Sequence, residues 1–552
     1  MSSNPQKVAL ISVYEKKEPD IAEFAQVLIK LGWKIISSGG TARYLTERGI
    51  EVQDVAELVG GAAILGQSAQ VTLSRELHAG LLARDCPEDI GELAELGISR
   101  IDLVCCDFYP LAKAIAVEGA TVESVIEQTD IGGPTMGRSA AKGGRISICD
   151  PADRQVVLEQ LQSLGDVCEE TIQYLRAKTE FVVASYCLDS ARFHGEGDFD
   201  GLLGHKVLQL AYGENRDQSP ADLFSTGSFD PLAWDKFQVI SGVPGYINMA
   251  DGDRTLQIMC LLAEACRVNF TGKVPYIVIA CKHGNPCGLG VDWDDPITAV
   301  TKAMLGDPIA VMGSEIMTNF VITPEAGEEI FRVHSLLKGK VGRKFWGADV
   351  VFAPGFCDEA VELLGKRERR RLLVNEALLE PVMAVEEWAI KPVRGGFIRQ
   401  KALNFVFDEK QVEWLSKGER SAEFLMNLLI AWSVAWRADS NTVTMANNSS
   451  LIGSGVGQQD RIFCVQLCVD RARRSKHNID GAVFASDAFF PFAERSNRNK
   501  PRERGELLAD VGCIGGVVPA DGKNLGEVKS FFLGRKMQVA FVPKEHRGFS
   551  QH

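Results

Sequence analysis

The chain has 552 residues, of which 45% are hydrophobic and 24% charged, and its 60 Lys and Arg against 73 Asp and Glu give a formal charge of −13. This length predicts about three domains, and the composition excludes a disordered chain, a collagen and a coiled coil. The negative charge argues against a general binder of nucleic acid or anionic membranes, because both need a basic surface. Small anionic ligands are still possible, since a few local cations and amides can hold them.

Neither a targeting signal nor a membrane-spanning segment is expected. The first residues lack the apolar core of a signal peptide. The most apolar stretch, Phe424–Trp436, is too short to span a membrane and contains Asn427 and Ser433. It is therefore expected to form a buried helix. The 14 cysteines are scattered without a Cys-x-x-Cys spacing, which predicts reduced thiols in a cytoplasmic protein without a metal site.

The N-terminal third alternates strands and helices. Strands are expected at residues 8–13, 33–37 and 101–106, with helices at 21–31 and from 41 to 47. This alternation predicts a parallel sheet with a ligand site at the carboxyl ends of its strands. Ser38-Gly39-Gly40-Thr41 stands at one such end, where glycine amides and hydroxyl groups suit an anion. A plain turn capped by Thr41 would give the same pattern.

A polar, Gly-rich stretch at residues 190–202 indicates a domain boundary, which we place between residues 198 and 199. A larger α/β portion follows. Its apolar strands are expected at residues 276–281, 350–352, 442–446 and 482–485, and its long helices at 256–267, 296–304 and 461–475.

The strongest chemical signal is Lys282-His283, which follows directly on an apolar strand. A nearby ammonium favours the neutral imidazole, so His283 would be able to accept a proton. We expect the following Asn285-Pro286-Cys287-Gly288 to form a turn that holds both side chains away from the sheet. The alternative is an exposed loop with two incidental polar residues.

Two further clusters have the composition of ligand sites. Asp439-Ser440-Asn441 is followed by the Gly-rich stretch 453–461, where alternating glycines would let a ligand approach the backbone and Arg461 would reach an anion. Ser486–Phe492 forms an aromatic turn after a strand, which would stack a planar ring. A flexible loop and a plain core segment are the respective alternatives.

Taken in order, these segments resemble the bifunctional purine-biosynthesis family with AICAR formyltransferase and IMP cyclohydrolase activities. The matching segments span nearly the whole chain: Ser12–Lys16, Ser38–Thr41, Tyr109-Pro110, Asp130–Thr135, Ala140–Lys142, Tyr212–Asn215, Lys282–Gly288, Gly455–Gln458 and Ser486–Phe492. The resemblance implies a methylglyoxal-synthase-like parallel-sheet domain at residues 1–198. It also implies a formyltransferase portion at 199–552, built from two cytidine-deaminase-like α/β/α subdomains that meet near 375–390, and a homodimer.

The resemblance also implies site residues and a co-substrate, 10-formyltetrahydrofolate. His283 would be the base that assists attack by the 5-amine of AICAR, Lys282 would stabilise the oxyanion or the departing folate nitrogen, and Asn441 would orient the reacting groups. Nucleotide and folate contacts would come from Tyr212, Gly213, Arg461, Asp349, Phe489, Pro491, Arg547 and Phe549. The cyclohydrolase-like site would comprise Lys16, Ser38, Gly39, Gly40, Thr41, Thr72, Tyr109, Asp130 and Lys142.

The chain departs from the family pattern at both sites. Where the cyclohydrolase motif has Arg, Lys and His, this sequence has Ala69, Val71 and Ser74. Losing two cations there removes charge that would hold the nucleotide and neutralise a forming oxyanion. The formyltransferase half keeps Lys282, His283 and Asn441, but Ala211 and Asp217 replace an Arg and a His, and Val311-Met312-Gly313-Ser314 replaces a folate-side loop.

The sequence therefore favours a folate-dependent formyltransferase acting on AICAR or a similar ribonucleotide, with an impaired cyclohydrolase half. Two alternatives are a conventional bifunctional enzyme that makes IMP, and a catalytically weak paralogue that binds purine intermediates.

Overall fold

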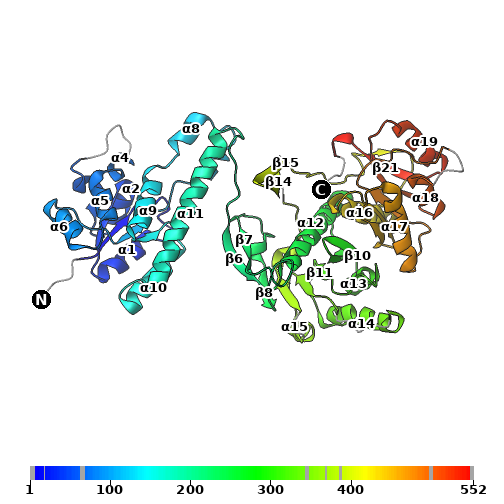
Figure 1. The fold of residues 1–552 in the computed structure, drawn as a ribbon, viewed down its shortest axis with the longest axis horizontal. Coiled ribbons are helices and arrows are strands. Elements are labelled where there is room, and N and C mark those ends of the chain that lie inside the picture. Colours follow the sequence, from blue (N-terminus) through cyan, green and yellow to red (C-terminus); the bar gives the residue numbers. More distant parts are fainter. Residues whose placement is uncertain are drawn as a thin grey trace. The chain divides into compact units, whose positions relative to one another are not determined.

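The structure, a computed structural model, describes residues 6–17, 19–61, 69–341, 347–366, 370–384, 388–496 and 502–546, and the side chains of 69–70 and 333–341 lie outside this description. Contacts divide the chain into two units, Met1–Leu203 and Gly204–His552 (Figure 1). The expected boundary between residues 198 and 199 stays a prediction. Each unit is described by itself.

The N-terminal unit is built on a five-stranded parallel sheet in the order β3-β2-β1-β4-β5. The strands are β1 (Val8–Ile11), β2 (Lys34–Ser37), β3 (Gln53–Asp54), β4 (Leu103–Cys105) and β5 (Ile146–Ile148). The central strands are uninterrupted apolar runs, as burial on both faces of a parallel sheet requires. The predicted parallel sheet is therefore confirmed.

Helices surround this sheet and carry the loops at its carboxyl edge. They are α1 (Ile21–Lys30), α2 (Gly39–Thr46), α3 (Val55–Leu58), α4 (Ala69–Thr72), α5 (Arg75–Leu82), α6 (Pro87–Glu95), α7 (Leu111–Ile115), α8 (Val122–Glu127), α9 (Gly132–Gly143), α10 (Asp153–Leu164) and α11 (Glu169–His194). In the sheet register, Ile11 lies beside Ser37 and Cys105. The segments that leave β1, β2 and β4 therefore start side by side.

The second unit holds a twelve-stranded sheet in the order β16-β21-β20-β19-β17-β18-β10-β9-β11-β12-β13-β8. Its first half comprises β8 (Gln238–Ser241), β9 (Tyr276–Lys282), β10 (Asn285–Asp292), β11 (Glu315–Thr318), β12 (Val350–Ala353) and β13 (Arg371–Val374). Its second half comprises β16 (Glu413–Trp414), β17 (Val443–Asn447), β18 (Ser450–Gly455), β19 (Val483–Ser486), β20 (Gly515–Pro519) and β21 (Gln538–Val542).

The two halves repeat one arrangement. In each, a hairpin is followed by an antiparallel neighbour and two parallel strands: β10-β9-β11-β12-β13 and β18-β17-β19-β20-β21. The halves join where Gly290 of β10 pairs with Ser450 of β18. The expected pair of α/β subdomains is thus found as two halves of one sheet.

The helices of the two halves also correspond. α12 (Tyr246–Asn269) and α16 (Ala422–Arg437) precede the hairpins, and α13 (Pro296–Met304) and α17 (Arg461–Arg474) follow them. The other helices are α14 (Pro324–Val341), α15 (Asp358–Gly365), α18 (Arg504–Asp510) and α19 (Leu525–Gly534). Residues 424–436 of α16 are all buried, so the predicted buried helix is confirmed.

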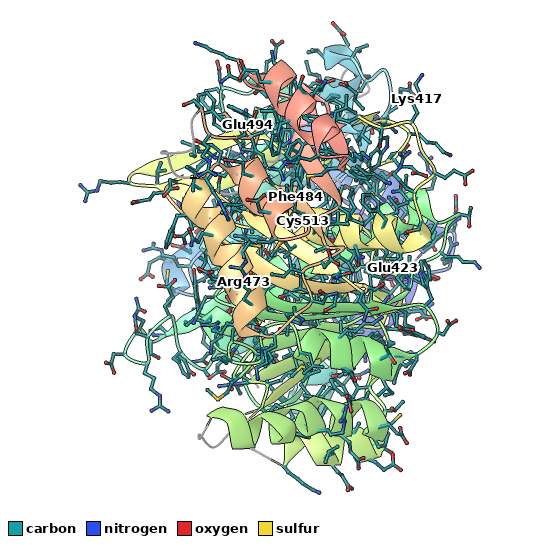
Figure 2. All side chains as sticks on the ribbon, turned by 90° about the vertical axis from the view of Figure 1, so that its right-hand side faces the viewer. Lys417, Glu423, Arg473, Phe484, Glu494 and Cys513 are labelled. Carbon is teal, nitrogen blue, oxygen red and sulfur yellow. The ribbon has the colours of Figure 1, made fainter. Side chains whose placement is uncertain are left out.

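Two small hairpins complete the second unit: β6 (His205–Leu210) with β7 (Ala221–Ser225), and β14 (Trp388–Val393) with β15 (Gly396–Lys401). In the second half of the large sheet, Phe484 and Cys513 are buried in the core, whereas Glu423 and Arg473 are exposed on its helices (Figure 2).

Candidate active site

The turn between β9 and β10 carries the first two predicted catalytic residues. Lys282 ends β9 and pairs with Asn285 at the start of β10, so only His283 and Gly284 form the loop. Both have a positive φ, 54° and 71°, the combination that a two-residue hairpin turn requires. The expected turn at residues 285–288 is therefore wrong: these residues belong to β10, and a register shift between Pro286 and Gly288 accommodates the proline.

Hydrogen bonds fix this turn to neighbouring segments. The Nζ of Lys282 donates to the carbonyl of Met312 at 2.8 Å. The backbone N–H of His283 donates to Oδ2 of Asp251 at 2.6 Å, and Nδ2 of Asn285 donates to the carbonyl of His283 at 2.8 Å. The imidazole is thus carried on a backbone that is held from both sides.

Helix α12 links this turn to the segment that carries Asn441. Asp251 binds the His283 amide, and Arg254, one helical turn further on, lies 3.5 Å from Oδ1 of Asp439 and donates to the carbonyl of Arg437. The two segments with predicted catalytic residues are therefore tied to successive turns of one helix.

Beneath the turn lies a second buried carboxyl group, Glu315 of β11. Asp251 is 5% exposed and Glu315 3%. The Oε1 of Glu315 accepts a hydrogen bond from Nδ2 of Asn248 at 3.0 Å, and Oδ1 of Asn248 accepts from the Gly245 amide at 2.9 Å. Burial, together with the negative charge of Asp251, raises the pKa of Glu315 to about 9.

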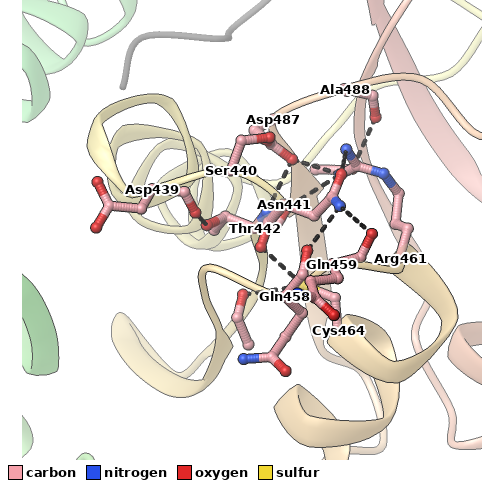
Figure 3. A network of polar contacts seen from close by, with 12 residues as sticks. Asp439, Ser440, Asn441, Thr442, Gln458, Gln459, Arg461, Cys464, Asp487 and Ala488 are labelled. Carbon is pink, nitrogen blue, oxygen red and sulfur yellow. Dashed lines mark hydrogen bonds and ion pairs between the residues drawn. The ribbon is translucent and has the colours of Figure 1, made fainter. Parts of the chain in front are cut away.

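Asn441 lies in a dense polar network (Figure 3). Its Nδ2 donates to the carbonyls of Gln458 at 2.7 Å and Gln459 at 3.3 Å, and its Oδ1 accepts from Arg461. Asp487, which is fully buried, accepts from Ser440, the Thr442 amide and Arg461. The carboxamide of Asn441 is thereby held in one orientation.

Arg461 takes part in this network and is only 6% exposed. Its Nη1 donates to Asp487 and, at 2.9 Å, to Ser486, and its Nη2 donates to Asn441. The side chain therefore buttresses Asn441 in this structure. A direct contact between Arg461 and the nucleotide stays a prediction.

Gly453 and Gly455, in the Gly-rich stretch 453–461, are needed for packing and not for the expected approach of a ligand. A Cβ on Gly455 would lie 2.0 Å from the carbonyl oxygen of Cys464, and one on Gly453 would lie 2.5 Å from that of Cys468. These glycines let β18 pack directly against the backbone of α17. The open approach for a ligand expected there is thus wrong for Gly453 and Gly455.

Tyr212 and Gly213 lie next to the start of α12. The Tyr212 carbonyl accepts from the Tyr246 amide at 3.0 Å, and a Cβ on Gly245 would lie 3.4 Å from the Tyr212 ring. Gly213 donates to the Gln218 carbonyl at 2.8 Å. The first turns of α12 therefore connect Tyr212 with Asp251 and with the His283 turn.

The remaining predicted contacts of this half are distributed over neighbouring strand ends. The Asp349 amide donates to the carbonyl of Ser314, which precedes Glu315, at 3.0 Å. Phe489 packs against Gly522, and the Pro491 carbonyl accepts from Asn524 at 2.9 Å. Arg547 and Phe549 lie outside the described residues.

A cavity of about 880 Å³ lies elsewhere in this unit, between β7, α12 and the β14–β15 hairpin. None of the predicted site residues lines it. Enclosed volume alone therefore does not locate the candidate active site.

In the N-terminal unit, the Ser38–Thr41 segment and Lys16 come together. Ser38 is the N-cap of α2, and its Oγ lies 2.8 Å from that of Ser12. Thr41 lies inside the helix, where its hydroxyl exchanges two hydrogen bonds with the backbone of Val13, so it does not cap the turn. The Gly39 and Gly40 amides precede the first hydrogen bond of the helix, which Thr41 donates to the Ser38 carbonyl at 3.1 Å, and the Lys16 side chain lies 3.9 Å from a Cβ position on Gly40.

Tyr109 and Asp130 extend this region. The rings of Tyr109 and Tyr14 meet edge to face at 5.5 Å. Oδ1 of Asp130 accepts from the Gly133 amide at 3.0 Å at the start of α9. Burial raises the pKa of Asp130, and the backbone amides of Gly133, Tyr109 and Gly132 oppose that rise. Lys142 is exposed near the far end of α9, about 15 Å along the helix axis.

The divergent stretch of the cyclohydrolase-like site is only partly described. Residues 62–68 and the side chain of Ala69 lie outside the described residues. Val71 is buried in a core cluster with Val55, Leu77 and Leu81, and Thr72 is buried beside it. Ser74 caps α5 by accepting from the Leu77 amide at 3.3 Å.

Sequence reasoning missed the groups that support His283. Asp251, Asn248 and Glu315 lie in a mainly apolar helix and a strand, and only the fold brings them under the β9–β10 turn. The sequence carries one signal for these groups. A carboxylate among buried residues costs free energy unless it has a hydrogen-bond or charge partner, so such a residue points to a partner elsewhere in the fold.

Among the described residues, no group of three or more His, Cys, Asp and Glu side chains is arranged to hold a metal ion. None of the described helices combines the length and the apolar character needed to cross a membrane.

Comparison with known proteins gives matches over most of the chain. The family model of the AICARFT/IMPCHase bienzyme matches residues 144–471, and that of the MGS-like domain matches residues 20–135. A bifunctional purine biosynthesis protein PurH of Caldicellulosiruptor saccharolyticus is 32% identical over 96% of this chain and 98% of that protein. The PurH of Bacillus mycoides is 32% identical over 89% of this chain and 91% of its own. Among solved structures, the "Crystal structure of ForH" is 32% identical over 34% of this chain and 100% of its own, with a TM-score of 0.30.

Proposed function

Because the chain belongs to the AICARFT/IMPCHase bienzyme family, we propose that it transfers a formyl group from 10-formyltetrahydrofolate to the 5-amine of AICAR or a similar ribonucleotide. The observation that carries this proposal is the β9–β10 turn. It presents Lys282, whose Nζ donates to the Met312 carbonyl, and His283, whose backbone N–H is held by Asp251. The bifunctional relatives support the purine-nucleotide context.

In the proposed reaction, the amine nitrogen attacks the formyl carbon, a new C–N bond forms, and the bond to the folate nitrogen breaks. His283 accepts the proton that the amine loses. Lys282 stabilises the tetrahedral oxyanion or the departing folate nitrogen, which takes up a proton. Asn441, oriented by Gln458 and Arg461, aligns the carboxamide beside the reacting amine.

We propose further that the cyclohydrolase half is impaired. In support, two residues at positions where the family pattern has a cation and a histidine serve local structure: Val71 is buried in the core and Ser74 caps α5. Lys16, Ser38 and Thr41 are present, so binding of a nucleotide phosphate is retained in this proposal. The homodimer and the cytoplasmic location stay predictions.

The formyl transfer is tested with purified protein, AICAR and 10-formyltetrahydrofolate, by following the release of tetrahydrofolate. We expect His283→Ala to lower kcat by about 10²–10⁴-fold, the usual contribution of a general base. His194→Ala, at the exposed end of α11, is the matched control and should leave kcat unchanged. Turnover that survives in His283→Ala would refute the assigned base, and binding without turnover in the unmodified protein would favour the paralogue that only binds purine intermediates.

A further inference from the structure

The buried carboxyl pair under the β9–β10 turn is not accounted for by the roles assigned so far. Asp251 of α12 and Glu315 of β11 are both nearly inaccessible to water, and Oε2 of Glu315 receives no hydrogen bond from an N–H or O–H group of the described residues. The carboxyl group of Asp251 lies close enough to Glu315 for its negative charge to raise the pKa of Glu315. The carboxyl groups of Asp251 and Glu315 thus lie together in one buried site.

Burial disfavours a negative charge on both members of the pair at once. Two carboxylates side by side in a buried site repel each other, and Oε2 of Glu315 has no N–H or O–H donor among the described residues to stabilise a charge. Asp251 accepts the His283 amide at 2.6 Å, whereas burial and the nearby Asp251 disfavour a charge on Glu315. Glu315 is therefore the protonated partner, and Asp251 is the acceptor that holds the His283 amide.

The charge on Asp251 has one evident use. His283 adopts a φ of 54°, which residues other than glycine rarely adopt. A charged acceptor makes a stronger hydrogen bond than a neutral one, and the His283 amide reaches this acceptor from the positive-φ conformation. The pair therefore helps to determine where the imidazole is presented.

We propose that Glu315 and Asp251 are positioning residues, in which a proton on Glu315 lets Asp251 hold the His283 backbone in its working conformation. Loss of that proton places two negative charges side by side and releases the turn. This inference rests on the proposed formyl transfer, since His283 acts as the base in that reaction.

Other titratable groups near the pair do not change this expectation. Glu315 acts electrostatically on the thiols of Cys281 of β9 and Cys287 of β10, and Lys282 acts on the thiol of Cys287. Burial raises the pKa of both thiols, that of Cys287 to about 12. Asn248, which donates to Glu315, does not titrate. Glu315 is thus the group of this cluster expected to lose its proton first as the pH rises above neutrality.

The test compares the pH dependence of kcat in the unmodified protein and in Glu315→Gln, whose amide mimics the protonated acid at every pH. We expect equal kcat near pH 7 within about twofold, and above about pH 9 a fall of about tenfold per pH unit in the unmodified protein only. Glu329→Gln, which replaces a buried glutamate ion-paired with Arg332, is the control and should keep the alkaline fall. An identical fall in Glu315→Gln would overturn the inference.

Infrared pH-difference spectra test the pair without relying on activity or on a variant that folds. The unmodified protein should show the C=O stretch of a buried protonated carboxylic acid at pH 7, and the band should disappear as the pH passes through about 9. Glu315→Gln should lack this band, and Glu329→Gln should retain it. No such band in the unmodified protein would refute the pair. A band without any tetrahydrofolate release would instead refute the proposed reaction while leaving the pair in place.

Discussion

Each predicted catalytic side chain in the formyltransferase half depends on a second residue that determines where it lies. His283 depends on Asp251, Lys282 on the carbonyl of Met312, and Asn441 on Arg461. The first members of these pairs were found in the sequence because they stand at strand ends in a recognisable order. Of the second members, Met312 and Arg461 were noticed for other reasons and Asp251 was not, because partners far apart in sequence are brought together only by folding.

The buried acid Glu315 predicts a pH dependence of stability. Its pKa is raised in the folded state from 4.5 to about 9, so the native state holds one more proton than the unfolded chain between these values. The contribution of that proton to the free energy of unfolding is complete below about pH 4.5 and is lost as the pH rises to about 9. The free energy of unfolding falls by at most about 1.4 kcal/mol per pH unit in this range.

Glu315→Gln should remove this dependence. Urea unfolding of the variant and of the unmodified protein at pH 6 to 9 would measure it: the free energy of unfolding should decrease more steeply with pH in the unmodified protein. Parallel curves would show that Glu315 does not hold the extra proton.

At the scale of elements, the seven strands expected from the sequence all correspond to observed strands, namely β1, β2, β4, β9, β12, β17 and β19, because apolar runs are a local property. Most of the other strands, and the long helices α11 and α14, were not predicted. The sequence did not predict β10, since Pro286, Gly288 and Gly290 argue against a strand when read alone. The fold explains both glycines: a Cβ on Gly288 would lie 1.9 Å from the Ala303 carbonyl oxygen, and one on Gly290 2.3 Å from that of Ala299. Strand β10 packs on α13 as β18 packs on α17.

This repeated strand–helix contact makes the glycines essential for stability. Gly455→Ala places a methyl group 2.0 Å from the backbone carbonyl oxygen of Cys464, which flexible side chains cannot relieve. We expect a loss of at least about 2 kcal/mol in the free energy of unfolding, measured with urea. Gly418→Ala, where the added Cβ would meet nothing within 4 Å, is the matched control. A Gly455→Ala protein as stable as this control would contradict the close packing.

At the scale of the whole molecule, the net charge of −13 says little about the ligands that we propose, which are anions. The relevant charges are local. Lys16, Lys282 and Arg461 are present at the two candidate sites, whereas Val71 occupies a buried core position where the family pattern has a lysine. The two halves of the chain therefore differ in what they retain, and we expect them to differ in activity.

The most direct test of this account measures both reactions in one preparation of the purified protein. Tetrahydrofolate release is followed with AICAR and 10-formyltetrahydrofolate, and IMP formation is followed separately with formyl-AICAR. The account predicts tetrahydrofolate release that depends on His283, together with little or no IMP formed from formyl-AICAR. Rapid IMP formation, or no tetrahydrofolate release from the unmodified protein, would contradict it.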